Sequence, residues 1–334
     1  MKKNLAIVGL GRIGRTILKK AVLQDLEIKL ISDKNPNIKN HAYLIKYDST
    51  YGEFSGDVIA KKESIAIDDK NITFQQSQNI SDLDLSEIDI LIDATGSKSN
   101  EEQAKKVSED NNLKVIITKS STFADKEVVF GLNHNIIEES DKIISGSICD
   151  ANALAHILNF LDSEYGIESG NFISLHPWLS YQNLVDSSLY SFSDPNMPWN
   201  EFSLGRSAVD SLIPKNTTAV DACEIILPNL KDKLSSFSYR TPLNTVTSGN
   251  LQAVITEEIS ENDLYESLKQ RFNDGELFNF EEEDLVSIDY KATDYSLSLY
   301  SKSIKLKKKL ISLSFWYDNE WAYSQRIIDI AKIL

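Results

Sequence analysis

The sequence is poor in cysteine, in positive charge and in long apolar runs, and each shortage excludes a class of protein. Only Cys149 and Cys223 occur among 334 residues, so no disulfide framework is expected and a functional cysteine would act as a thiol. With 35 Lys and Arg against 50 Asp and Glu, the net charge of −15 argues against a general nucleic-acid surface. No apolar run approaches a membrane span, and the start lacks a secretory signal. We therefore expect a soluble, cytoplasmic protein without membrane or nucleic-acid partners.

Histidine is also scarce. The four histidines are scattered relative to the two cysteines, so the spacing predicts no metal-ligand cluster and we expect no metal. What the chain does have is length and a 41% apolar content, which together favour two domains with proper cores.

The first 150 residues alternate short β-branched runs with helical patterns, which is the βαβ rhythm of a parallel sheet. Strands are expected at 5–8, 27–32, 88–94, 115–118, 128–130 and 142–147, and helices at 13–23, 37–47 and 100–110.

After residue 150 the strands lengthen and follow one another with less helix between them. They are expected at 172–178, 234–240, 251–256, 287–290 and 310–316, before a final helix over 319–334. The whole pattern predicts an α/β protein: a domain with a parallel βαβ sheet followed by an α+β domain with a mainly antiparallel sheet.

The turn Gly9-Leu10-Gly11-Arg12-Ile13-Gly14 directly follows an apolar strand and opens a helix. Gly9 permits the tight turn, Gly11 permits close approach of a pyrophosphate and Gly14 permits close helix–strand packing, while the helix N-terminus favours the anion. Asp33 ends the next strand, where a carboxylate accepts hydrogen bonds from both ribose hydroxyls and repels a 2′-phosphate. The expected cofactor is therefore NAD rather than NADP. A glycine-rich turn without a ligand is the alternative.

Cys149 lies where a predicted strand meets an apolar-periodic helix, 153–161. The positive end of a helix dipole lowers the pKa of a cysteine and populates the nucleophilic thiolate. The alternative, which this segment favours when taken on its own, is a small buried residue at a turn. Cys223 lies inside the apolar pattern 219–227 and is expected in the core.

Several motifs along the whole chain together resemble the phosphorylating glyceraldehyde-3-phosphate dehydrogenases and their relatives acting on erythrose 4-phosphate. These motifs are the glycine turn at 9–15, YDSTYGEF at 47–54, ATG at 94–96, GLNH at 131–134, the Cys149 and Asn152 segment, and WYDNEWAYS at 316–324. The resemblance implies an NAD-binding Rossmann domain over 1–148, a catalytic domain over 149–316, a C-terminal helix over 317–334 that packs back on the first domain, and a homotetramer.

The resemblance also implies site residues. Cys149 is the implied nucleophile and His176 its base, which fits the chemistry of a thiohemiacetal oxidised to a thioester. Asn319 is implied to fix the nicotinamide carboxamide, with the Tyr323 ring near it. Arg12, Ile13, Thr95, Gly96 and Thr118 are the remaining cofactor residues. The rival base His156 lies about two helical turns after Cys149 and is expected to be a packed or capping residue, and His41 and His134 are expected to be surface or core residues.

The sequence departs from the family pattern where the family binds phosphate. Hydroxyl residues are replaced by Ile148, Asp150 and Leu179, and an expected arginine by Leu204, unless Arg206 takes its place. The remaining substrate-site residues are Thr217, Thr218 and Arg240. Losing donors and adding the Asp150 charge weakens a site for a dianion. A longer segment over 187–202 is expected either to reshape the cofactor contact of a neighbouring subunit or to be a tolerated surface insertion.

The expected function is NAD-dependent oxidation of an aldehyde through Cys149 and His176, as in glycolysis, with altered phosphate sites. Two alternatives remain open. One is oxidation of another, non-phosphorylated aldehyde with water as acyl acceptor, and the other is a non-catalytic paralogue that binds NAD.

Overall fold

Two units make up the chain, and each is built on its own sheet. The computed structural model describes residues 2–189 and 201–334. One unit contains 2–147 and 324–334, and the other contains 148–189 and 201–323. The aromatic and proline residues of the long segment, from Tyr190 to Trp199, lie outside the described residues.

The first unit is a Rossmann-type domain, as predicted. Its nine-stranded sheet has the order β10-β11-β9-β8-β1-β2-β7-β6-β5, and the strands from β10 to β7 run parallel. The strands are β1 (Asn4–Val8), β2 (Glu27–Asp33), β5 (Val58–Ala60), β6 (Ser64–Ile67), β7 (Lys70–Gln76), β8 (Ile90–Asp93), β9 (Lys114–Ile117), β10 (Lys126–Glu127) and β11 (Ile143–Ser145). A separate pair is formed by β3 (Tyr47–Asp48) and β4 (Gly52–Glu53).

The chain order of this sheet reverses between β1 and β8, because β1 continues to β2 on one side and pairs with β8 on the other. In open parallel sheets a ligand binds at such a switch point, beyond the carboxyl ends of the strands. The Gly9 turn follows β1, and Thr95 with Gly96 follows β8. The topology therefore brings two of the predicted cofactor segments to the same edge of the sheet.

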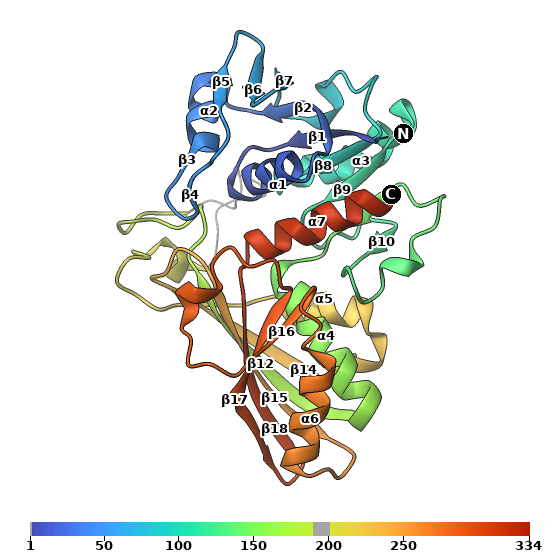
Figure 1. Ribbon diagram of the computed structural model, residues 1–334, viewed down its shortest axis with the longest axis vertical. Helices are drawn as coiled ribbons and strands as arrows, with labels where there is room; N and C mark the ends of the chain where they lie inside the picture. Colours follow the sequence, from blue (N-terminus) through green and yellow to red (C-terminus); the bar gives the residue numbers. More distant parts are fainter. Residues whose placement is uncertain (1, 190–200) are drawn as a thin grey trace. The chain divides into compact units, whose positions relative to one another are not determined.

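The α-helices in the described part of this unit are α1 (Arg12–Leu23), α2 (Ile38–Lys46), α3 (Lys98–Asn111) and, from Ser324 onward, α7 (Trp321–Ile333). Helices α1 and α7 lie side by side (Figure 1), and the Gln325 side chain bonds to Lys20 at 3.2 Å and to Gln24 at 2.7 Å. The end of the chain thus packs with the N-terminal residues.

The second unit has a seven-stranded sheet in the order β13-β14-β12-β15-β18-β17-β16. Only the pairs β12 with β14 and β16 with β17 are parallel, so the sheet is mainly antiparallel as predicted. Its strands are β12 (Ile167–Pro177), β13 (Ile213–Lys215), β14 (Leu234–Thr241), β15 (Thr247–Ile255), β16 (Phe278–Glu281), β17 (Leu297–Lys307) and β18 (Leu310–Tyr317).

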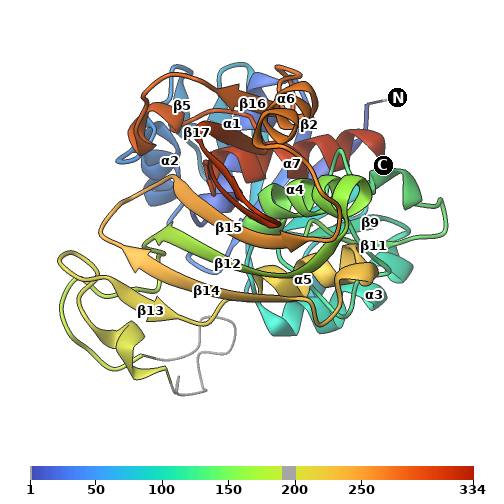
Figure 2. The same cartoon turned by 90° about the horizontal axis from the view of Figure 1, so that it is seen from below.

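One face of this sheet is covered by α4 (Cys149–Tyr165), α5 (Ala219–Ile226) and α6 (Glu261–Arg271). Figure 2 shows β14, β12 and β15 side by side, with α4 and α5 on the same side of them. Side chains alternate accordingly along β12: Phe172, Ser174 and His176 are buried, whereas Ile173 and Leu175 are 37% and 39% exposed. The alternation places His176 on the helix-covered face.

Two of the expected strands are wrong. The run 287–290 forms a 3-10 helix (Ser287–Tyr290), in which the Asp289 carboxylate accepts from the Val286 N–H at 2.8 Å. The strand expected at 128–130 lies earlier, at Lys126–Glu127, because Val129 instead accepts the turn bonds from Leu132 and Asn133. Among the described residues no helix is both long and apolar enough to span a bilayer.

Candidate active site

The glycine turn after β1 has the geometry that a dinucleotide requires. Gly9 has φ +88, and a Cβ there would lie 2.8 Å from the backbone of Ala94 and Thr95. A Cβ at Gly14 would lie 1.8 Å from the Gly9 carbonyl oxygen, whereas a Cβ at Gly11 would meet nothing within 4 Å. The turn is therefore closed on its sheet side and open at Gly11, at the N-terminus of α1, where a pyrophosphate fits.

Asp33 stands at the end of β2 with its carboxylate fixed by the backbone. One oxygen accepts from the Leu10 N–H at 2.8 Å and the other from the Asn35 N–H at 2.9 Å. Because each carboxylate oxygen accepts more than one hydrogen bond, both still have capacity for ribose hydroxyls. The buried His41 lies 3.9 Å from Asp33 and contacts the Asn35 carbonyl oxygen at 2.8 Å, so it supports this loop.

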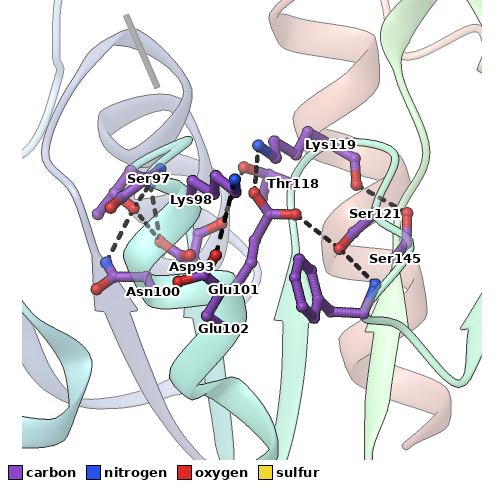
Figure 3. Close-up of polar contacts among 12 residues, drawn as sticks. Asp93, Ser97, Lys98, Asn100, Glu101, Glu102, Thr118, Lys119, Ser121 and Ser145 are labelled. Atoms are coloured by element: carbon purple, nitrogen blue, oxygen red, sulfur yellow. Dashed lines mark hydrogen bonds and ion pairs between the residues drawn. The ribbon is translucent and has the colours of Figure 1, made fainter. Parts of the chain in front are cut away.

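Thr95 and Thr118 are held by Asp93, a residue that sequence reasoning missed. The Asp93 carboxylate accepts from the Thr95 N–H at 2.9 Å and hydroxyl at 2.6 Å, and the Thr118 hydroxyl donates to the Asp93 carbonyl oxygen at 3.0 Å. Figure 3 shows Asp93 between Asn100 and Thr118. Burial raises the pKa of Asp93. An acid closing an apolar strand, directly before Ala94-Thr95-Gly96, was the signal available in the sequence.

In the second unit, Cys149 opens α4 and faces His176 at the end of β12. The Cys149 Sγ and His176 Nε2 are 3.7 Å apart. His176 Nδ1 lies 2.7 Å from the Pro177 carbonyl oxygen, and since a carbonyl only accepts, Nδ1 carries the proton. The lone pair of Nε2 therefore points toward the thiol, which is the arrangement of a nucleophile and its general base.

Asp150 completes this cluster. Its carboxylate is 4% exposed and lies 3.5 Å from the Cys149 Sγ. The Tyr317 hydroxyl donates to Asp150 Oδ1 at 2.7 Å, and the Thr217 hydroxyl donates to Oδ2 at 3.4 Å. Two other segments of the second unit thus hold the buried Asp150 carboxylate beside the sulfur.

The expectation that the helix dipole lowers the pKa of Cys149 is wrong for this site. Burial raises the pKa of the thiol well above its usual range, and the Asp150 charge raises it further. Burial and the Arg240 charge lower the pKa of His176 to about 4. At neutral pH the pair is therefore a thiol and a neutral imidazole, because loss of hydration and a neighbouring carboxylate outweigh the dipole.

Arg240 is a buried cation on the same face of the sheet. The parallel register pairs Arg240 on β14 with His176 on β12. Its guanidinium contacts the Tyr181 hydroxyl at 3.5 Å, and its Nε has no hydrogen-bond partner in the described part of the chain. A buried guanidinium with an unused donor fits an anionic ligand.

The other predicted substrate residues differ in whether their side chains can donate a hydrogen bond to an anion. Ile148 precedes α4 and has no capping side chain, and Leu179 contributes its backbone to a turn with Gln182. Leu204 is fully buried among Ala208 and Ile213. Arg206 is exposed and paired with Asp186 at 2.7 Å, and Thr218 is exposed at the start of α5. Neither the leucines nor Ile148 supplies a side-chain donor.

Asn319 carries a buried amide oxygen with no partner among the described residues, an orphaned acceptor that suits a carboxamide ligand. Tyr323 is buried near it in sequence. His156 is fully buried against Phe278, His134 accepts from the Gly131 N–H, and Cys223 is fully buried. His156 and Cys223 are packing residues, as expected, and His134 is a half-buried residue at the start of a 3-10 turn.

Three potential metal ligands lie together in the fold, although their spacing in the sequence predicts no cluster. Donor atoms of Cys149, Asp150 and His176 all lie within 4.8 Å of one another, a group with metal-binding donor types. This group could not be predicted from spacing, because His176 is distant from Cys149 in the sequence and only the fold places the end of β12 beside the start of α4.

A dinucleotide-binding domain joined to a domain with a paired thiol and imidazole defines an NAD-dependent dehydrogenase. Residues 3–101 match the NAD binding domain of glyceraldehyde 3-phosphate dehydrogenase, and residues 148–319 match its C-terminal domain. The chain belongs to the glyceraldehyde-3-phosphate dehydrogenase family, and NAD is the cofactor of its N-terminal domain.

Relatives extend over the whole chain at modest identity. It is 30% identical to glyceraldehyde-3-phosphate dehydrogenase 2 of Bacillus subtilis, over 99% of this chain and 96% of that protein. It is 31% identical to glyceraldehyde-3-phosphate dehydrogenase 1 of Saccharomyces cerevisiae, over 98% of each. It is 32% identical to the chloroplastic enzyme GAPA1 of Arabidopsis thaliana, over 100% of this chain and 84% of that protein.

Proposed function

We propose that this protein oxidises an aldehyde with NAD through a covalent thioester on Cys149. The observation that carries the proposal is the 3.7 Å pair of Cys149 Sγ and His176 Nε2, with the imidazole tautomer fixed by Pro177. In this proposal 1–148 binds NAD, 149–316 carries the chemistry, and 317–334 contributes Asn319 and Tyr323 to the cofactor.

His176 carries out the proton transfers of this reaction. His176 Nε2 takes the thiol proton as the sulfur attacks the carbonyl carbon, and returns it to the alkoxide to give a thiohemiacetal. Bound NAD supplies a two-electron acceptor for the hydride that leaves this carbon. The hydroxyl proton passes to His176 Nε2 in the same step, so that the carbon becomes a thioester carbonyl and His176 an imidazolium.

The substrate preference follows from the anion-binding side chains. Arg240 supports one anionic group, since the Thr217 hydroxyl already donates to Asp150, whereas Ile148 and Leu179 replace hydroxyl donors and Asp150 adds a negative charge. We therefore propose a substrate with at most one anionic group, and little dependence of turnover on inorganic phosphate.

A test is NADH formation with a panel of aldehydes: glyceraldehyde 3-phosphate, erythrose 4-phosphate, glyceraldehyde and succinic semialdehyde, each with and without phosphate. We expect NADH with at least one of them. NAD binding without NADH formation from any aldehyde would instead favour a non-catalytic NAD-binding paralogue.

We also propose a homotetramer, as in the family. The supporting observation is that, in the part of the chain that the structure describes, Ile173 and Leu175 on β12 are exposed apolar side chains on the face of the second sheet opposite His176. Exposed apolar side chains clustered on one face are typical of a surface that another subunit covers.

Cofactor preference tests the role of Asp33. Its carboxylate repels a 2′-phosphate, so we expect the wild type to bind NAD more tightly than NADP, and Asp33→Ala to reduce that preference about tenfold or more. Calorimetric titration with both cofactors measures it. The matched control is Asp57→Ala on an exposed loop of the same unit, and equal wild-type affinities would refute the assignment.

A further inference from the structure

Burying a carboxylate beside a nucleophilic sulfur costs free energy. A carboxylate that is retained there is expected to have a function. Asp150 disfavours ionisation of Cys149 and adds like charge where an anionic acyl acceptor would approach. Its position is nevertheless fixed from two sides, by Tyr317 at 2.7 Å and Thr217 at 3.4 Å. Both contacts are hydroxyl donors, so both carboxylate oxygens of Asp150 are acceptors held in a fixed orientation.

We propose that Asp150 is a general base that makes water the acyl acceptor, so that the protein releases a free carboxylic acid. This inference rests on the proposed thioester at Cys149. The Asp150 oxygen lies 3.5 Å from the Cys149 Sγ, so a water bound to this carboxylate lies beside any acyl carbon attached to the sulfur.

The proton transfers of this step divide between an acid for the sulfur and a base for the water. Once the hydride has left, His176 holds a proton at Nε2 and is an acid. A water that attacks the thioester carbon must give its proton to another acceptor, which is Asp150. As the carbon–sulfur bond breaks, His176 returns its proton to the sulfur. Asp150 then releases the proton it took from water to solvent, and the acid loses its own proton as it leaves as a carboxylate. No further oxidant or reductant enters this step.

Charge decides between water and phosphate as acceptor. A phosphate dianion would approach a buried carboxylate at short range, where the local dielectric strengthens repulsion, whereas a neutral water gains a hydrogen-bond acceptor there. Ile148, directly before Cys149, supplies no hydroxyl to offset that repulsion. The Asp150 carboxylate therefore repels phosphate and activates water as the acyl acceptor.

The experiment uses p-nitrophenyl acetate, an activated ester that acylates a nucleophilic thiol without NAD or an aldehyde. For the wild type we expect a burst of one p-nitrophenolate per Cys149, then turnover to acetate at a rate that phosphate leaves unchanged. For Asp150→Asn we expect the same burst amplitude, about 100-fold slower turnover and an acetyl group trapped on Cys149 by intact mass, because a general base typically contributes 10²–10⁴-fold. Asp150→Glu should recover part of the rate.

The matched control is Asp210→Asn, which removes an exposed carboxylate from the same unit and should leave burst and turnover unchanged. Acetyl phosphate formed by the wild type in millimolar phosphate would overturn the inference, as would unchanged turnover in Asp150→Asn. Loss of the burst in that variant would also overturn it, by placing Asp150 in acylation. Because the probe bypasses hydride transfer, a protein that hydrolyses the ester but oxidises no aldehyde would fail the proposed function and not this inference.

Discussion

Replacing Cys149 with serine should abolish aldehyde oxidation, with a fall of about 10³-fold or more, while NAD binding is unchanged. The structure gives the reason, since Cys149 Sγ is the group that faces the Nε2 lone pair of His176 at 3.7 Å. A serine hydroxyl is a far weaker nucleophile at neutral pH. NADH formation and calorimetric NAD affinity, measured on the same preparation, separate chemistry from binding.

The two histidines of this unit provide the matched comparison. His176→Asn removes the base and should slow NADH formation by about 10²–10⁴-fold. His156→Asn changes a fully buried residue packed on Phe278, so it should lower thermal stability and leave the catalytic rate of the folded protein nearly unchanged. The reverse order of effects on the rate would move the base onto α4.

Alkylation gives an independent measure of the same thiol. Cys149 is half-buried and Cys223 fully buried, so iodoacetamide should label Cys149 first. Because the pKa of Cys149 is raised, its thiolate is scarce at neutral pH, and labelling should accelerate as pH rises past 9 instead of levelling off near 7. A plateau near neutral pH, or preferential labelling of Cys223, would contradict the thiol environment described above.

Much of the first unit could be predicted because its signals are local. An apolar strand, a glycine turn and an amphipathic helix lie within 20 residues of one another at Asn4–Val8 and Arg12–Leu23. The hairpin of β5, β6 and β7 was missed, because polar residues interrupt its short apolar runs. The run 287–290 was misread as a strand, although Asp289 caps a single helical turn there.

Less of the chemistry of the site could be predicted from the sequence. Cys149 and His176 could be identified by motif, but the partners of Asp150 could not, because Tyr317 is 167 residues away along the chain. A pKa depends on such contacts and on burial, neither of which a local pattern contains. The expected helix-dipole effect on the pKa of Cys149 is therefore outweighed by burial and by the Asp150 carboxylate. Only the fold brings these two influences together at the thiol.

Glyceraldehyde 3-phosphate should be a poor substrate relative to other members of the family. A hydrogen bond to a charged group contributes about 1.5–3 kcal/mol, and each 1.4 kcal/mol is about tenfold in affinity. Absence of the donors at Ile148 and Leu179 thus weakens anion binding by about 100-fold or more. Leu204 adds to the loss, since it is fully buried in an apolar cluster, and the exposed Arg206 is engaged by Asp186.

Restoring the donors should reverse this preference. The triple variant Ile148→Ser, Asp150→Thr and Leu179→Thr removes the opposing charge and adds three hydroxyls on the side where Arg240 keeps an unused Nε donor. We expect kcat/KM for glyceraldehyde 3-phosphate to rise at least tenfold and turnover to become saturable by millimolar phosphate, as measured by NADH formation across a phosphate series. Leu184→Thr with Leu212→Thr, two exposed leucines of the same unit, is the control and should change neither quantity. Efficient, phosphate-saturable oxidation of glyceraldehyde 3-phosphate by the wild type would show that other groups supply the missing donors, since Arg240 and Thr217 alone do not provide two anion sites.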